Sequence, residues 1–173
     1  MMTIATGVQA VAEAQYGRTD EAMWYVDKIV QTFNRKLPGS ISEMMPDWGS
    51  FTIAWTIYGI VIPVIEHIFG IHSDAITKTI VFDPHLPTGW EDISIEDLPI
   101  GTNTISFRRR KTPRGIAYSL KAKERGWTLI LRGVALPGAT YRVNGRERPV
   151  GPSGIRLTEL RNHVLVVPPL SPP

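Results

Sequence analysis

The hydrophobic pattern of this chain changes its period near residue 76, and this change limits the folds that the chain can adopt. Before that point Ile4, Val8 and Val11 recur at steps of three and four, which is the spacing of one helical face. From Ile80 onward, apolar and polar residues alternate in short runs, as they do in half-buried strands. The sequence therefore predicts a segregated α+β fold, in which an N-terminal helical segment precedes an antiparallel β-sandwich.

The helical segment is predicted to contain about three helices. The first ends at Gly17, because glycine takes a positive φ without strain. The second begins at Thr19 or Asp20, either of which can cap its N-terminus, and it ends at residues 36–39.

The third helix is predicted over residues 51–69, with a bend at Pro63 and an end at Gly70. Its apolar run is almost long enough for a membrane span, which needs about 20 mostly apolar residues. The run contains Glu66 and His67 as well as the proline. We therefore expect a helix buried on most sides and no contact with a membrane.

Seven short segments carry the strand pattern, and turn residues separate them. These segments are residues 79–83, 93–96, 104–108, 117–121, 128–131, 141–143 and 164–167. No helical crossover lies between them, which favours antiparallel pairing in a sandwich. We expect a helical domain over residues 1–75, a sandwich over residues 76–170 and a disordered tail over residues 171–173.

The distribution of charge supports the same division. Residues 1–75 contain four basic and eight acidic groups, a net charge of −4, whereas the remainder contains fifteen basic and eight acidic groups, a net charge of +7. A length of 173 residues allows one good-sized domain or two small ones, and 43% apolar residues suffice for a core.

Composition also excludes several chemistries. The chain has no Cys, so disulfides, thiolate metal sites and a cysteine nucleophile are excluded. The nearest pair of histidines, His67 and His72, lies five residues apart across a glycine, so we expect no metal site and no cofactor. Residues 1–14 lack the basic start of a signal peptide, and we expect a cytoplasmic protein.

The loop between the second and third predicted helices, SISEMMPDWGS, is the most informative segment for function. It carries Glu43, Asp47 and Trp48, and Trp55 follows shortly after it. Glycoside hydrolysis uses two carboxyl groups, and indole rings stack on sugar faces. The same segment also fits a plain structural loop, in which Ser42 or Asp47 caps the third helix and Trp48 packs in the core.

The run GSISEMMPDWGSFTIAWTIYGIVIPVIEHIFGI resembles the last helical hairpin of the six-hairpin glycosidases, the (α/α)6-barrel hydrolases that include glycogen-debranching amylo-α-1,6-glucosidases and bacterial α-L-rhamnosidases. The run KTIVFDPHLPTGWEDISIEDLPIGTNTISF is similar to the start of the β-sandwich that follows the barrel in several of those families. The resemblance covers roughly residues 1–110. It implies that Glu43 acts as the general base of an inverting mechanism and that Asp47, Trp48 and Trp55 bind the saccharide.

The resemblance also implies what this chain lacks. An (α/α)6 barrel contains twelve helices and the general acid of the family lies far upstream, so we expect a C-terminal fragment that is inactive alone. The debranching-type members commonly have Gln before the Ala-Trp pair, where this chain has Ile53. The missing barrel portion, or a second copy of the chain, is the partner expected to cover the helical face.

Two other functions fit parts of the sequence. The sandwich could be a carbohydrate-binding or purely structural module, with Trp90 and Trp127 as candidate sugar platforms or as core residues. The basic run at residues 108–111, with further basic residues nearby, could bind nucleic acid. We prefer to interpret that run as a solvated hairpin, because charges also protect sheet edges.

Overall fold

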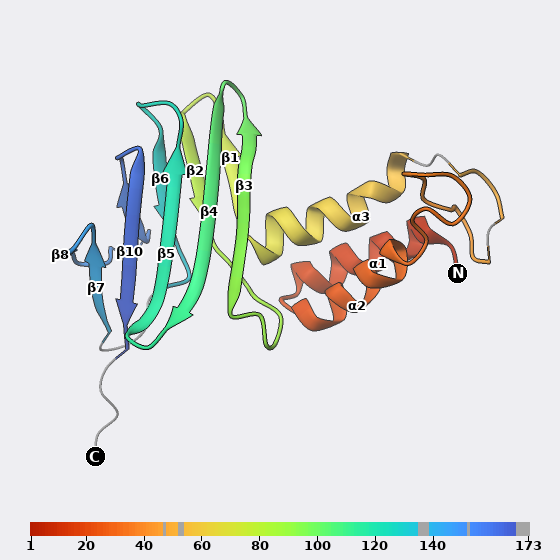
Figure 1. The fold of residues 1–173 in the computed structure, drawn as a ribbon, viewed down its shortest axis with the longest axis horizontal. Helices are drawn as coiled ribbons and strands as arrows, with labels where there is room; N and C mark the ends of the chain where they lie inside the picture. Colours follow the sequence, from red (N-terminus) through yellow and green to blue (C-terminus); the bar gives the residue numbers. More distant parts are fainter. Residues whose placement is uncertain (47, 52–53, 135–138, 152, 169–173) are drawn as a thin grey trace, which may run out of the picture. The chain divides into compact units, whose positions relative to one another are not determined.

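The structure is a computed structural model that describes residues 1–46, 48–51, 54–134, 139–151 and 153–168. The chain forms two compact units. The first comprises Met1–Ile71 together with Pro84–Thr88, and the second comprises His72–Asp83 and the chain from Gly89 onward. Helices come first and two sheets follow, which confirms the predicted α+β class (Figure 1). The predicted tail over residues 171–173 lies outside the described residues.

The helical unit contains two regular helices, α1 (Thr3–Gln15) and α2 (Thr19–Val30). A third helical stretch consists of the 3-10 turn η1 (Ala54–Ile57), the α-helical turn α3 (Tyr58–Val61) and the π-helical η2 (Ile62–Ile68). The apolar faces of the helices form the core of the unit, with fully or almost fully buried side chains at Ala10, Ala22, Val26, Ile29 and Ile68.

Two glycines allow the backbones of α1 and α3 to meet. A Cβ placed on Gly7 would lie 3.0 Å from the Cα of Gly59, and a Cβ placed on Gly59 would overlap the Cα of Gly7. Neither glycine has a positive φ, so close approach of the two backbones, and not a turn conformation, is the reason that a side chain does not fit.

The ends of the helices agree with the sequence in part. Gly17 follows α1 with a φ of 75°, and Gly70 follows η2 with a φ of 61°, as predicted. The predicted cap of α2 is wrong: Arg18 occupies the N-cap without a side-chain hydrogen bond, and Thr19 is buried inside the helix. The helix also ends at Val30, earlier than residues 36–39.

The predicted bend at Pro63 takes the form of a π-helix. Proline has no backbone N–H, so the regular bond to the carbonyl four residues back cannot form at this position. The π-helical η2 contains Pro63 near its start and accommodates the missing donor by widening the backbone. In the part of the chain that the structure describes, no helix has both the length and the hydropathy needed to cross a bilayer.

The second unit is a β-sandwich of two sheets, which form two layers in Figure 1. The larger sheet has the order β3-β4-β5-β10-β7-β8, formed by β3 (Asp92–Ile100), β4 (Asn103–Thr112), β5 (Gly115–Ala122), β10 (Arg161–Val167), β7 (Thr140–Val143) and β8 (Arg146–Glu147). The smaller sheet has the order β1-β2-β6-β9, formed by β1 (Ile71–Asp74), β2 (Thr79–Phe82), β6 (Thr128–Leu131) and β9 (Ile155–Leu157).

All seven predicted strands are present, as β2 to β7 and β10. The larger sheet is antiparallel throughout, as predicted. The smaller sheet is mixed, because β2 and β6 pair in parallel while β6 and β9 pair antiparallel. The parallel pair needs no helical crossover, since the chain passes through β3, β4 and β5 in the opposite sheet before it returns as β6.

The core of the sandwich lies between the two sheets. Phe82 on β2 stacks on Phe107 on β4, with ring centroids 5.1 Å apart and an interplanar angle of 12°. Both rings are almost completely buried, and Tyr118 on β5 packs against Phe107 at 6.2 Å. These aromatic contacts join the two sheets and fix which face of β4 and β5 remains on the outside.

Candidate functional site

The loop that carries Glu43 is tied to the start of α1 by its backbone. The N–H of Thr3 donates to the carbonyl of Glu43 at 2.8 Å, and the N–H of Met45 donates to the carbonyl of Met1 at 2.8 Å. Met44 and Trp48 exchange two backbone hydrogen bonds, at 3.1 and 3.0 Å. These bonds hold the loop as a small hairpin against the helical unit and fix the position of Glu43.

A buried threonine reinforces this arrangement. The hydroxyl of Thr3, which is 0% exposed, donates to the carbonyl of Ser42 at 2.9 Å and lies 3.1 Å from the hydroxyl of Thr56. Thr56 belongs to η1 and is also fully buried. The start of α1, the loop and η1 are therefore joined through one polar cluster, and Trp55 precedes Thr56 in η1.

The side chain of Glu43 is oriented by the far end of the same loop. Its Oε2 accepts a hydrogen bond from the N–H of Ser50 at 2.9 Å, and its own N–H donates to the carbonyl of Ser50 at 3.0 Å. Gly49 has a φ of 78°, and a Cβ at this position would overlap Oε2 of Glu43. Glu43 as a residue is half-buried, and no described residue bonds to its Oε1.

The other predicted residues of this site divide into two groups. Trp48 and Trp55 are 69% and 60% exposed, so both indoles are available to a ligand. The alternative interpretation, in which Trp48 packs in the core, is wrong. Asp47 lies outside the described residues, and so does Ile53. The described part of the site therefore consists of one oriented carboxylate on a loop with two exposed indole rings near it in the chain.

The two tryptophans of the sandwich differ in their surroundings. Trp127 is 5% exposed, so its ring cannot serve as a sugar platform, and its buried indole N–H has no hydrogen-bond partner among the described residues. Trp90 is 40% exposed and lines a hollow of about 950 Å³ together with Arg109, Lys111 and Arg114. The core interpretation holds for Trp127, and Trp90 keeps an accessible ring.

The basic run on β4 alternates between the two faces of the sheet. Arg108 forms an ion pair with Asp92 at 2.8 Å, and its guanidinium holds the pKa of that carboxyl below the ordinary range. Lys111 pairs with Glu91 at 2.5 Å, and Arg109 donates to the carbonyl of the same glutamate at 3.0 Å. These contacts across β3 and β4 support the interpretation of the run as a solvated hairpin.

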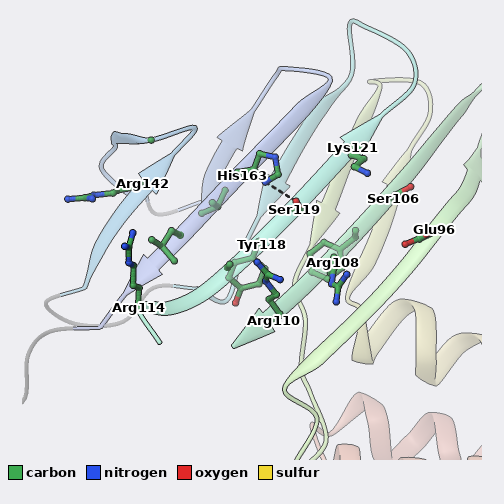
Figure 2. Close-up of a pocket in the computed structure, with 15 residues that line it drawn as sticks. Glu96, Ser106, Arg108, Arg110, Arg114, Tyr118, Ser119, Lys121, Arg142 and His163 are labelled. Atoms are coloured by element: carbon green, nitrogen blue, oxygen red, sulfur yellow. Dashed lines mark hydrogen bonds between the residues drawn. The ribbon is translucent and has the colours of Figure 1, made fainter. Parts of the chain in front are cut away.

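The outer face of the larger sheet carries a second hollow, of about 670 Å³, that the sequence analysis missed (Figure 2). Ser119 on β5 and His163 on β10 face each other there, with Oγ and Nδ1 2.9 Å apart. Arg142 on β7 joins them from the far side of β10. The period-two pattern places these residues on one face, but only the order of strands brings residues 119, 142 and 163 together.

Comparison with known proteins gives no family. No protein-family model matches the chain, and no curated protein matches it. The likeness to the six-hairpin glycosidases therefore rests on the quoted residues and stays a prediction. Among the residues that the structure describes, no group of three or more His, Asp or Glu side chains could hold a metal ion.

Proposed function

We propose that the helical unit supplies Glu43 as the general base of an inverting glycoside hydrolase that acts on oligo- or polysaccharide, and that Trp48, Asp47 and Trp55 bind the sugar. The observation that carries this proposal is the oriented carboxylate, whose Oε2 is held by the N–H of Ser50 while Oε1 has no described partner. A cytoplasmic location, predicted from the sequence, is part of the proposal.

The geometry suits the work of a base. In an inverting mechanism, one carboxylate removes a proton from the water that attacks the sugar carbon, while a carboxylic acid on the other side protonates the leaving oxygen. An oxygen that is already held fixes the direction of the carboxylate, and the remaining oxygen can accept the proton. The exposed rings of Trp48 and Trp55 offer flat apolar surfaces against which a sugar can stack.

The proposal includes a partner, because the helical unit exposes apolar side chains that a complete barrel would cover. Val8 on α1, Trp24 on α2, and Ile57 and Val61 in the third helical stretch are between 43% and 57% exposed. We propose the rest of a helical barrel as the covering partner. A second copy of the chain is the alternative, and analytical ultracentrifugation of the purified protein over a range of concentrations distinguishes the two.

The general acid can be bypassed in the test. A glycosyl fluoride carries a leaving group that departs without protonation, so its hydrolysis by inversion needs the base and water only. We expect slow hydrolysis of the matching glycosyl fluoride by the chain alone and no turnover of ordinary oligosaccharides. Because general-base catalysis contributes about 10²–10⁴-fold, Glu43→Gln should remove most of the fluoride activity.

Two variants separate the chemistry of Glu43 from its structural role. The amide oxygen of Glu43→Gln can still accept the hydrogen bond from Ser50, so the loop should keep its conformation. Gly49→Ala keeps the carboxylate of Glu43 but displaces it, since the new Cβ would overlap Oε2. We expect both variants to lose fluoride hydrolysis. Equal rates for the wild-type chain and Glu43→Gln would refute the role of Glu43, and turnover of ordinary oligosaccharides that Glu43→Gln abolishes would refute the dependence on a missing acid.

A further inference from the structure

The hollow on the outer face of the larger sheet is a second candidate site, and it belongs to the sandwich unit alone. It lies over β4, β5, β10 and β7, whose outward residues form its floor and walls (Figure 2). The strand register places Arg108 beside Ser119 and Ser119 beside His163, so one row of side chains crosses three strands. The volume of about 670 Å³ is in the range of sites that hold small organic ligands.

The charge of this hollow is strongly positive. Arg108, Arg110, Arg114, Lys121 and Arg142 line it, against a single carboxylate that comes from β3. Arg108 is paired with an aspartate, and Arg142 lies 3.4 Å from a glutamate. Arg110 lies opposite Asp92 in the register of β3 and β4 and helps to lower the pKa of that carboxyl. Within the described parts of the chain, Arg114 and Lys121 form no ion pair. The five cations outnumber the carboxylates near them, which indicates an anionic ligand.

The hollow adjoins the one that contains Trp90, because the two share Arg114, Arg142 and Leu165 in their walls. A ligand that contacts both hollows is longer than a single small molecule. In the second hollow Trp90 is 40% exposed, beside Arg109 of β4. A flat indole next to guanidinium groups binds a ring that carries negative charge.

The polar groups between the cations narrow the chemistry of the ligand. Ser119 and His163 form a hydrogen-bonded pair at 2.9 Å, and Ser106 and Glu96 line the same hollow (Figure 2). A carboxylate accepts hydrogen bonds from hydroxyl groups. Glu96 therefore favours a ligand that presents hydroxyl groups together with its negative charges.

The number of exposed aromatic rings disfavours single-stranded nucleic acid as the ligand. Proteins that bind single-stranded nucleic acid stack successive bases on several aromatic side chains. Among the described lining residues of the two hollows, Trp90 is the one exposed indole, since Tyr118 is 6% exposed and packs inward. One platform suits a single sugar ring within a longer chain.

We propose that this face of the sandwich binds an acidic oligosaccharide whose sugar units carry carboxylates. Arg110 and Arg114 bind the carboxylates, for which the planar guanidinium is well suited. Ser119 and His163 bind hydroxyl groups, and Trp90 stacks on a sugar ring. This site goes beyond the proposed function, because it lies in the other unit and uses neither Glu43 nor its loop.

The test measures binding of the full chain to an oligogalacturonide. A neutral malto-oligosaccharide of similar length and a single-stranded DNA oligonucleotide are titrated separately for comparison. Isothermal titration calorimetry gives the affinity, and tryptophan fluorescence reports on Trp90. We expect the oligogalacturonide to bind at least about tenfold more tightly than either other ligand. Since hydrogen bonds to charged groups contribute about 1.5–3 kcal/mol each, Arg110→Gln with Arg114→Gln should lower that affinity by more than about tenfold. Binding should weaken as salt is added.

Arg125→Gln is the matched control, because Arg125 is an exposed arginine of the same unit that lines neither hollow. It should leave the affinity unchanged, and so should Glu43→Gln, which keeps this site separate from the proposed function. Trp90→Ala should remove the fluorescence response and weaken binding. The proposal is overturned by equal affinity for the neutral oligosaccharide, by no binding of the oligogalacturonide, by tighter binding of the DNA, or by an equal loss in Arg125→Gln and the double variant. Far-UV circular dichroism establishes that each variant is folded before it is titrated.

Discussion

The contact between Gly7 and Gly59 makes the stability of the helical unit sensitive to a single methyl group. A Cβ on Gly59 would overlap the Cα of Gly7, and it would also lie 3.1 Å from Cδ1 of Ile29 and 3.3 Å from the carbonyl carbon of Gly7. Two of these three atoms belong to a backbone, which cannot rotate out of the way as a side chain does. Gly59→Ala must therefore move α1 away from α3.

The expected cost follows from two opposing effects. Extra atoms in a well-packed interior cost about 1–3 kcal/mol, and the overlap with a backbone atom places Gly59→Ala in the upper part of that range. Alanine in place of glycine within a helix stabilises by about 1 kcal/mol. We therefore expect Gly59→Ala to lower the free energy of unfolding by about 1–2 kcal/mol. Gly7→Ala places its Cβ 3.0 Å from one backbone atom of Gly59, so its smaller strain is offset by the helical gain and the net change should be close to zero.

Urea unfolding followed by far-UV circular dichroism measures this difference. With a slope of about 1–2 kcal/mol/M, Gly59→Ala should lower the midpoint of the helical transition by about 1 M, and Gly7→Ala should leave it nearly unchanged. The sandwich unit unfolds as a separate compact unit in this expectation, so its transition serves as an internal control. A Gly59→Ala protein as stable as the wild type, or a Gly7→Ala protein that is the less stable of the two, would show that the glycine contact does not limit the helix approach.

Two further predictions concern the sandwich core and the link at Thr88. Phe82→Ala should destabilise the sandwich by about 3–5 kcal/mol, because Phe82 is 0% exposed and stacks on Phe107; a loss below about 1 kcal/mol in the sandwich unfolding transition would contradict this packing. The hydroxyl and N–H of Thr88 donate to Asp20 and hold the pKa of its carboxyl below the ordinary value. That stabilisation is complete above the ordinary pKa of aspartate and is lost as the pH falls through the lowered value. A fall in pH should therefore lower the free energy of unfolding of the wild type more than that of Asp20→Asn. Equal pH dependence of stability in the two proteins would contradict the contribution of the Thr88–Asp20 hydrogen bonds.

The elements that the sequence predicted correctly are those set by local residues. The strand pattern and the glycines at 17 and 70 depend on neighbours within a few residues, and they were found at their predicted places. The predicted cap of α2 was wrong: Arg18 is the N-cap, Thr19 lies inside the helix, and the carboxylate of Asp20 accepts hydrogen bonds from Thr88, which is distant in the chain. No local pattern indicates such a partner.

The candidate sites also differ in whether their residues lie in one segment of the sequence or in several. The sequence singled out Glu43 and the two exposed tryptophans near it, because an acidic and aromatic loop between helices is visible in a single segment. It could not pair Ser119 with His163, since their contact depends on β10 lying beside β5. The parallel pairing of β2 with β6 could not be predicted from the sequence either, because the chain forms three strands of the other sheet before β6 begins.

The segment Pro84–Thr88 has a consequence for how the protein is made. The chain passes from the helical unit to the sandwich after Ile71, returns at Pro84 and leaves again after Thr88. During synthesis, Pro84–Thr88 joins the helical unit only after β1 and β2 have been made, and at that point β6, the partner of β2, does not yet exist. A single cut in the turn at Ile76, which is 96% exposed, would leave each fragment holding parts of both units. The two units are therefore distinct in space but cannot be obtained separately by one cleavage.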